Sequence, residues 1–524
     1  MNPSRQPELA QDEDHRPRFN AAPSPDPLPP PVPCNPMPSI VVVDDPSDWS
    51  LEIPGVQVVS SRDYLTDSSW SAMRHAKVFN LCESYRYQSL GYYVSLLATA
   101  RGHRPLPSVV TVQDLKTAGI VRAFGEDLDE LVQKNLARIT GREFDLSIYF
   151  GRNLAERYNK LGREIFNLFP APLLRAHFIS DGERWRLTSV RPLPLSEVPA
   201  THKAFVHQVA AEYFTGRQPN RTRRKQAQYD LAILHDPAAE SGPSNDKALK
   251  KFEQAAEDAG FDVTFVTRED YGILGEFDAL FIRDTTAVNH YTYRFARRAV
   301  AEGVVVIDDP ESIVRCTNKV FMAEALARHD VSIPKTLVVD RSGMARIEGE
   351  LGFPCVLKQP DSAFSRGVVK VDSREELERE CDRLLDSSEL IVAQEFMRTD
   401  FDWRIGIIDD KPLFACRYHM APKHWQIVRR DQPGKSEFGQ VDAVPIDLVP
   451  PKVMRTALKA ASLIGNGLYG VDIKQIGRNV HVIEINDNPN IDAGYEDAIL
   501  KDRLYAEIMS VFARRVRARG REEE

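Results

Sequence analysis

The sequence has little cysteine and no long apolar run. Its six cysteines show none of the paired spacings that hold zinc or form redox-active disulfides. Unpaired cysteines suit a reducing compartment better than an oxidising one. No apolar segment is long enough to cross a bilayer, and the N-terminal region is charged and polar, without the apolar stretch of a secretory signal. We therefore expect a cytoplasmic protein with no membrane segment.

The sequence also lacks an excess of positive charge. Its formal net charge is −8, with 68 lysines and arginines against 76 aspartates and glutamates. A general nucleic-acid-binding protein usually carries a basic surface, so this balance argues against that function. The basic runs Arg221–Lys225 and Arg514–Arg521 fall in an expected linker and an expected tail, where solvated charge explains them.

Length and composition predict several domains, because 524 residues exceed what one hydrophobic core supports. Prolines crowd the first 38 residues, and such a segment cannot bury enough apolar surface to order itself. Apolar strands then alternate with amphipathic helices, as in α/β domains with parallel sheets. The predicted organisation is a disordered tail at 1–38, an α/β domain at 39–195, a linker with one helix at 196–227, a small α/β domain at 228–312, a further domain at 313–512 and a charged tail at 513–524.

Two apolar segments near the C-terminal end predict neighbouring strands that carry oxygen ligands. Leu468–Ile473 includes Asp472, and Val480–Ile485 leads through Glu484 to Asn486. Residues two apart on a strand share a face, so Glu484 and Asn486 point the same way. Carboxylate and amide oxygens suit Mg²⁺ when phosphate oxygens complete its shell. The alternative is ordinary turn chemistry, since acids at strand ends often only meet solvent.

A lysine follows a predicted buried strand and precedes a polar loop. Phe353–Leu357 has the strand pattern, Lys358 ends it, and the loop contains Ser365 and Gly367. A lysine in this position can offset phosphate charge while loop amides surround the same anion. On these residues alone, an ordinary hairpin is the favoured alternative.

Three arginines stand at predicted strand ends. Arg404 precedes one strand and Arg417 ends the next, so a hairpin between them could bring both to one end and clamp developing negative charge. Arg283 follows an earlier strand, where it could meet a substrate carboxylate. Solvated surface arginines are the alternative for each.

The order of these motifs resembles the ATP-grasp ligases of the RimK and glutathione-synthetase type. The resemblance rests, in chain order, on Asn318-Lys319, Lys358, the Ser/Gly loop, Gln394-Glu395-Phe396-Met397, Asp402-Trp403-Arg404, Arg417, Gly470-Val471-Asp472 and Glu484-Ile485-Asn486. It covers about residues 313–512 and implies an ATP-grasp fold there. Residues 228–312 then resemble the small pre-ATP-grasp domain, and 39–195 the N-terminal domain ahead of some RimK-like proteins. The expected fold class is multidomain, α/β and α+β.

The resemblance also implies roles for single residues. The lysines that hold the ATP phosphates correspond to Lys319 and Lys358, the flap over them includes Ser365 and Gly367, the adenine hinge is Glu395 and Phe396, and Asp402 is an acid near the nucleotide. The metal ligands correspond to Asp472, Glu484 and Asn486, for Mg²⁺ or, as the alternative, Mn²⁺. Arg404 and Arg417 would stabilise the transferred phosphoryl group, so catalysis needs no nucleophilic side chain.

These expectations point to an ATP-dependent carboxylate–amine ligase. ATP would phosphorylate a carboxylate, and an amine would attack the acyl phosphate. The resemblance implies amino-acid or peptide-like substrates, with glutamate or another amino acid added to a protein or peptide acceptor, and it leaves homo-oligomer formation open. A non-catalytic ATP-binding regulatory module is the alternative. Lys423-His424-Trp425 departs from a Phe-Arg-Ser-Asn-like segment of the family, so a contact to nucleotide and substrate is open there.

Overall fold

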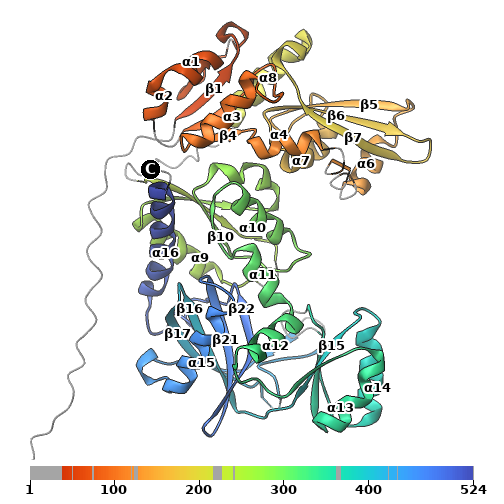
Figure 1. The fold of residues 1–524 in the computed structure, drawn as a ribbon, viewed down its shortest axis with the longest axis vertical. Coiled ribbons are helices and arrows are strands. Elements are labelled where there is room, and N and C mark those ends of the chain that lie inside the picture. The colour runs from red at the N-terminus through yellow and green to blue at the C-terminus, as the bar shows by residue number, and fades with distance from the viewer. Residues whose placement is uncertain are drawn as a thin grey trace, which may run out of the picture.

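Figure 1 shows three folded parts along one long axis, in a computed structural model of the chain. The structure describes residues 38–522 except 50, 74–75, 118, 120, 123–124, 126–127, 216–226, 240–241, 362–366, 423 and 433–434. The tail predicted at 1–38 therefore lies outside the described residues, apart from Pro38. None of the described helices combines the length and the apolar character that a bilayer-spanning helix needs.

The N-terminal part contains a parallel sheet and an antiparallel sheet. The parallel sheet has the order β2-β1-β3-β4, with β1 (Ser39–Val43), β2 (Val56–Ser60), β3 (Lys77–Asn80) and β4 (Arg104–Leu106). The antiparallel sheet has the order β5-β6-β7, with β5 (Glu143–Tyr149), β6 (Leu173–Ser180) and β7 (Trp185–Pro192). The helices are α1 (Ser61–Thr66), α2 (Ser68–Ala72), α3 (Leu90–Ala100), α4 (Val109–Lys116), α6 (Asp129–Leu136), α7 (Asn159–Leu168) and α8 (Lys203–Thr215).

Helix α8 lies in the region predicted to be a linker, and the helix itself was predicted. Its Val206 and Val209 are buried in one cluster with Val41 of β1 and Phe79 of β3. Because the helix contributes to this core, residues 203–215 pack as part of the N-terminal body rather than as a free connection.

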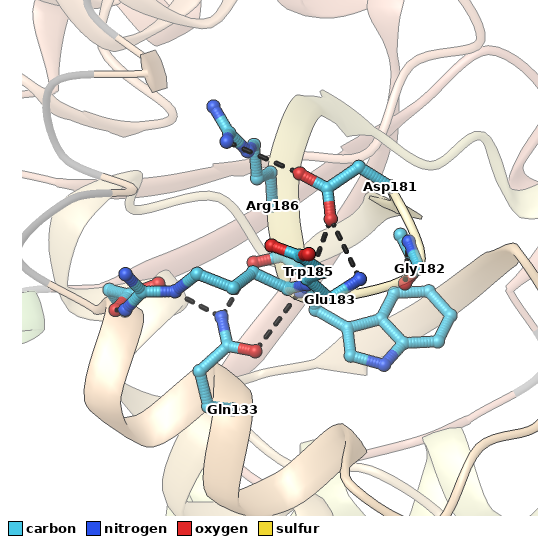
Figure 2. A network of polar contacts seen from close by, with 9 residues as sticks. Gln133, Asp181, Gly182, Glu183, Trp185 and Arg186 are labelled. Carbon is cyan, nitrogen blue, oxygen red and sulfur yellow. Dashed lines mark hydrogen bonds and ion pairs between the residues drawn. The ribbon is translucent and has the colours of Figure 1, made fainter.

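A side-chain amide fastens the turn between β6 and β7 to helix α6 (Figure 2). The Gln133 side chain accepts a hydrogen bond from the Trp185 backbone N–H at 3.0 Å and donates one to the Trp185 backbone carbonyl at 2.7 Å. Asp181 accepts from the backbone N–H of Glu183 and is paired with Arg186. The backbone hydrogen bonds from Arg184, the larger influence, and from Glu183 lower the pKa of Asp181, so its carboxylate form stabilises the turn.

The middle part is a parallel sheet in the order β11-β10-β8-β9, flanked by helices. Its elements are β8 (Tyr229–Leu234), α9 (Asp246–Asp258), β9 (Phe261–Val266), β10 (Ala279–Ile282), α10 (Tyr291–Ala301), β11 (Val305–Ile307) and α11 (Pro310–Thr317). Strand β10 is buried along its whole length and β8 from Leu231 to Leu234, which explains their apolar sequences there.

The C-terminal part has two main sheets. One is antiparallel in the order β12-β15-β13-β14, with β12 (Thr336–Val339), β13 (Cys355–Lys358), β14 (Val368–Val371) and β15 (Ile391–Glu395), beside α12 (Lys319–Arg328), α13 (Met344–Leu351) and α14 (Arg374–Leu385). The other has the order β20-β17-β16-β21-β22, with β16 (Phe401–Ile408), β17 (Lys411–His419), β20 (Val441–Ala443), α15 (Pro451–Ser462), β21 (Leu468–Ile476) and β22 (Asn479–Asp487). A small hairpin joins β18 (Val428–Gln432) and β19 (Lys435–Phe438). Ser373 caps α14 by accepting from the Glu376 backbone N–H.

The last helix, α16 (Asp502–Glu522), runs back along the middle part (Figure 1). Its Phe512 packs against Phe281 of β10, and its Tyr505 packs against Phe252 of α9. Residues 513–522, which we expected in a charged tail, continue this helix, and Val516 is still buried. The apolar face persists between the charged residues, which explains why the helix does not end earlier.

Candidate active site

The hairpin of β21 and β22 brings the three predicted oxygen ligands together. Asp472 lies opposite Glu484, and Gly470 lies opposite Asn486, so the three side chains share one sheet face. The Asn486 side-chain amide donates to Asp472 Oδ2 at 3.2 Å, which leaves the Asn486 carbonyl oxygen for another partner. Within the described residues, no three His, Cys, Asp or Glu side chains gather as metal ligands. Two carboxylates and one amide therefore fit a cation that takes its remaining ligands from phosphate.

Arg404 of β16 holds Asp472 in a bidentate pair. Its Nε and one terminal nitrogen donate to the two carboxylate oxygens, each at 2.6 Å. Burial, the largest influence, raises the pKa of Asp472, while Arg404 lowers it. Burial is the largest single influence and lowers the pKa of Arg404, but the charge and hydrogen bonds of Asp472, together with Tyr418 and Glu496, hold that pKa above its usual range. The guanidinium stays charged beside the ligand set, where a transferred phosphoryl group would develop negative charge.

Two lysines from different elements face the same space. Lys319 begins α12, which Asn318 caps, and its ammonium lies 3.2 Å from Glu484. Lys358 ends β13 and donates to the Gln394 side-chain carbonyl at 2.8 Å. Burial lowers the pKa of Lys358 to about 8. Burial raises the pKa of Glu484, but the two lysines outweigh it and the net shift is downward.

A small cavity of about 20 Å³ lies between these lysines, and apolar residues of α12 and β22 complete its wall. Met322 and Val482 are among them. The cavity is far smaller than a nucleotide, and the Lys319–Glu484 pair stands beside it. When a nucleotide binds, its phosphate would therefore have to replace Glu484 as the partner of Lys319. The Glu484 carboxylate would then be available to a cation.

Asp402 is paired with a residue that the sequence reasoning missed. Lys474 of β21 donates to Asp402 Oδ1 at 2.6 Å and to the Thr399 hydroxyl at 2.6 Å. Lys474 also lowers the pKa of Lys358 by charge repulsion, although less than burial does. It is thus a third lysine of the site, beside Lys319 and Lys358. Its position two residues after Asp472 on the same strand was the available signal.

The predicted adenine hinge lies at the end of β15. The backbone of Glu395 pairs with Lys335, whose carbonyl accepts from the Glu395 N–H at 2.8 Å. Phe396 contacts the Trp425 ring at a centroid distance of 5.9 Å, and the Lys370 ammonium lies 5.4 Å from its centroid. Trp425, in the segment that departs from the family pattern, therefore lies beside Phe396.

The predicted flap is only partly described. Ser365 and the loop residues 362–366 lie outside the described residues, as does Lys423 of the departing segment. Gly367 is described, with φ at +69°, and a Cβ there would lie 2.6 Å from the Gln359 side-chain oxygen. The positive φ favours glycine at the point where the loop rejoins β14.

The structure does not bring Arg417 to Arg404. Arg417 lies opposite Trp403, and Arg404 lies opposite Cys416, so the two arginines project from opposite faces of the sheet. The Arg417 guanidinium stacks on Trp403 at 4.8 Å from the ring centroid, and Arg404 lies against Tyr418. The expectation of one shared clamp is wrong because adjacent positions along a strand alternate in direction.

Arg283 does not meet a substrate carboxylate in this arrangement either. Its side chain is fully buried, and its nitrogens donate to Asn488, Ser244 and two backbone carbonyls. It joins the middle part to the loop after β22, so it contributes to structure between the two parts.

Comparisons with known proteins show what this chain is similar to. Residues 61–209 match the family model of the RimK-like ATPgrasp N-terminal domain, and residues 316–501 match that of the RimK-like ATP-grasp domain. A probable alpha-L-glutamate ligase of Cellvibrio japonicus is 25% identical over 232 residues, which are 43% of this chain and 73% of that protein. An alpha-aminoadipate–LysW ligase LysX of Saccharolobus solfataricus is 28% identical over 194 residues, 36% of this chain and 67% of that protein. A D-alanine–D-alanine ligase structure from Bacillus anthracis covers 56% of this chain and 99% of its own at 14% identity, with a TM-score of 0.43.

Proposed function

The chain belongs to the RimK-like ATP-grasp ligases, and we propose that it uses ATP to join a carboxylate to an amine through an acyl phosphate. The phosphoryl group moves from ATP to the carboxylate, and the amine then displaces phosphate, so that an amide, ADP and phosphate result. This chemistry needs positioned cations and hydrogen-bond donors more than a nucleophilic side chain. It takes place in the cytoplasm, and its metal is magnesium or, as the alternative, manganese.

The observation that carries the proposal is a set of three ion pairs formed by the predicted site residues and Lys474. Lys319 pairs with Glu484, Arg404 with Asp472, and Lys474 with Asp402. Each cation can turn to a phosphate oxygen while its carboxylate turns to a metal or a hydroxyl. The ion pairs already gather these charged side chains before the nucleotide arrives.

We assign roles to the chain's own groups on that basis. Lys319 and Lys358 bind the ATP phosphates, and Glu395 with Phe396 borders the adenine. Arg404 stabilises the phosphoryl group in transfer. Asp472, Glu484 and Asn486 would hold the divalent cation, which supplies further neutralisation of phosphate charge when bound.

The substrates are amino acids or peptide-like molecules. Two relatives carry names of ligases that act on glutamate and on alpha-aminoadipate with LysW. We propose, in line with them, that an amino acid is one substrate and that a peptide or protein end is the other. The N-terminal part, which those ligase roles do not require, is a candidate for holding the larger substrate.

ADP formation tests the proposal against simple nucleotide binding. With magnesium, ATP and a mixture of amino acids and peptides, the wild-type chain should release ADP and phosphate, and mass spectrometry should find a new amide. The Lys358→Ala variant should lose both. If ATP binds but neither ADP nor an amide appears under any mixture, the chain is a non-catalytic ATP-binding module instead.

A further inference from the structure

Two contacts of different kinds hold the Arg404 guanidinium. Two of its nitrogens donate to the Asp472 carboxylate, each at 2.6 Å. Its central carbon lies over the face of the Tyr418 ring, 4.8 Å from the ring centroid. The first contact occupies N–H donors, whereas the second rests on the attraction between a cation and the negative face of an aromatic ring.

The strand register places Tyr418 on the same sheet face as Arg404. Arg404 of β16 lies opposite Cys416 of β17, and Tyr418 is two residues further along β17. Residues two apart on a strand point to the same side, and side chains on this diagonal are within reach of each other when they are long. The contact between the arginine and the tyrosine ring therefore follows from the pairing of β16 with β17.

Glu496 fixes the far end of the Tyr418 side chain. The Tyr418 hydroxyl donates to Glu496 Oε1, and the Asp492 backbone N–H donates to Glu496 Oε2 at 2.7 Å. Glu496 is only 3% exposed. The Asp492 side chain in turn accepts from the Asn245 backbone N–H at 2.6 Å, at the cap of α9. The support beneath Arg404 therefore extends through three residues of the C-terminal part to the middle part.

We propose that Tyr418, held by Glu496, is a positioning residue that keeps Arg404 in place for phosphoryl transfer. Asp472 is also assigned to the divalent cation, so its oxygens cannot serve Arg404 alone when that cation is bound. Arg404 must then turn N–H donors towards phosphate oxygens. The contact with the ring uses none of these donors, so it holds the guanidinium while the donors change partner. This inference rests on the proposed function and adds a residue that acts through Arg404.

Kinetic measurements on variants of the full chain test whether Tyr418 acts through Arg404. Tyr418→Leu removes the ring and should lower kcat for ADP release about tenfold or more, because a small misplacement of a catalytic group is costly. KM for ATP should stay within about twofold, since Lys319 and Lys358 hold the phosphates. Tyr418→Phe keeps the ring but loses the Glu496 contact, so its kcat should lie between those of the wild type and Tyr418→Leu. Added to Arg404→Ala, Tyr418→Leu should cause no further loss, because no guanidinium remains to be positioned.

The matched control is Phe401→Leu. Phe401 contacts the other arginine of the hairpin, Arg417, at 5.1 Å from the ring centroid and lies on the opposite face of the sheet. Its removal takes away a similar aromatic contact outside the site, so kcat should stay within about twofold of the wild type. Equal kcat values in Phe401→Leu and Tyr418→Leu overturn the inference. So does an undiminished further loss when Tyr418→Leu is added to Arg404→Ala, which is what a purely structural residue would give.

A spectroscopic measurement tests the contact without any substrate. Arginine side chains of the full chain are labelled with nitrogen-15, and the Arg404 Nε–H signal is identified by its loss in Arg404→Ala. In the wild type, with and without MgADP, this proton should show a nuclear Overhauser contact with tyrosine ring protons. In Tyr418→Leu the signal should shift and broaden, because the ring no longer shields or restrains it.

Each spectroscopic outcome decides. The absence of an Arg404 signal, the absence of its contact with a tyrosine ring, or an unchanged signal in Tyr418→Leu overturns the inference. If Tyr418→Leu does not fold, the contact in the wild type still decides. Absence of ADP release with every substrate mixture contradicts the proposed function instead, and the spectra then show separately whether Tyr418 holds Arg404.

Discussion

Arg404 and Arg417 differ by the face of the sheet from which they project. Both were predicted from sequence as a clamp, because each stands at the end of a strand in one hairpin. The residue register places Arg404 against Asp472 and Arg417 against Trp403. The sequence spacing predicted which end of the hairpin each arginine lies near. The face of the sheet on which each lies depends on the strand register, and a shift of one residue reverses it.

Replacing Arg404 should reduce turnover far more than replacing Arg417. Arg404→Ala removes the buried donor beside the metal ligands, and loss of such preorganised charge typically costs about a hundredfold in kcat or more. Arg417→Ala removes a cation stacked on Trp403 on the other face, so its kcat should stay within a few-fold. Steady-state ADP release measures both. Equal losses in the two variants would contradict the face assignment.

Nucleotide affinity should weaken as the pH rises above about 8. Burial depresses the pKa of Lys358 to about 8 in the free protein, so the ammonium is present below this pH and is lost above it. Each pH unit above the pKa then reduces the affinity for MgATP by up to about tenfold, because the binding form of Lys358 becomes rarer. Lys358→Arg, whose guanidinium keeps its proton, should flatten this slope between pH 7.5 and 9.5 in a titration of the dissociation constant. A wild-type affinity independent of pH would refute the role of Lys358.

At the scale of elements, the β21–β22 hairpin fixes the site by close approach. A Cβ on Gly470 would lie 2.8 Å from the Pro489 Cβ and 3.2 Å from the Arg404 Cδ. Only glycine therefore lets β16 and the loop after β22 meet at this point. The close contact positions Arg404 over the ligand face.

Gly470→Ala should destabilise the chain and lower activity together. Overpacking at this contact should cost roughly 1–3 kcal/mol in the free energy of unfolding. The matched control is Gly349→Ala in α13, where a Cβ meets nothing within 4 Å, and which should stabilise by up to about 1 kcal/mol. Urea denaturation would measure the stability of both variants, and ADP release would measure their activity. An active, fully stable Gly470→Ala variant would show that the contact is not needed.

The sequence predicted what depends on local pattern and missed what depends on pairing across distance. The hairpin of Asp472, Glu484 and Asn486 follows from two apolar strands with a short turn, and the structure brings the three together. The contact of Lys474 with Asp402 spans 72 positions and needs β16 beside β21, which no local pattern specifies. Helix α8 and residues 513–522 were assigned to linker and tail because composition alone does not reveal which apolar residues find a core.

At the scale of the whole molecule, buried ion pairs join the N-terminal and middle parts. Asp278 is 1% exposed and accepts from Arg104 at 2.5 Å and from the Asp230 backbone N–H at 2.8 Å. Lys77 pairs with Glu276 at 3.1 Å beside it. Since the partners come from the amino ends of β3 and β4, this edge of the first sheet faces the middle part.

Asp278→Ala should loosen this junction. Removing one partner of a buried pair leaves the other uncompensated, which typically costs about 3–5 kcal/mol. Differential scanning calorimetry should show a lower and broader transition, with the N-terminal part unfolding first. The control is Arg186→Ala in the exposed pair with Asp181, which should change stability by less than about 1 kcal/mol. If both substitutions changed the stability by a similarly small amount, the Asp278 ion pair would not hold the N-terminal and middle parts together.

Oxygen transfer tests the central claim most directly. Amino-acid and peptide mixtures labelled with oxygen-18 in their carboxylates would be incubated with the wild-type chain, magnesium and ATP, and the released phosphate analysed by mass spectrometry. An acyl-phosphate route predicts one labelled oxygen in the phosphate formed together with ADP. Unlabelled phosphate accompanying amide formation, or AMP and pyrophosphate in place of ADP, would contradict the account.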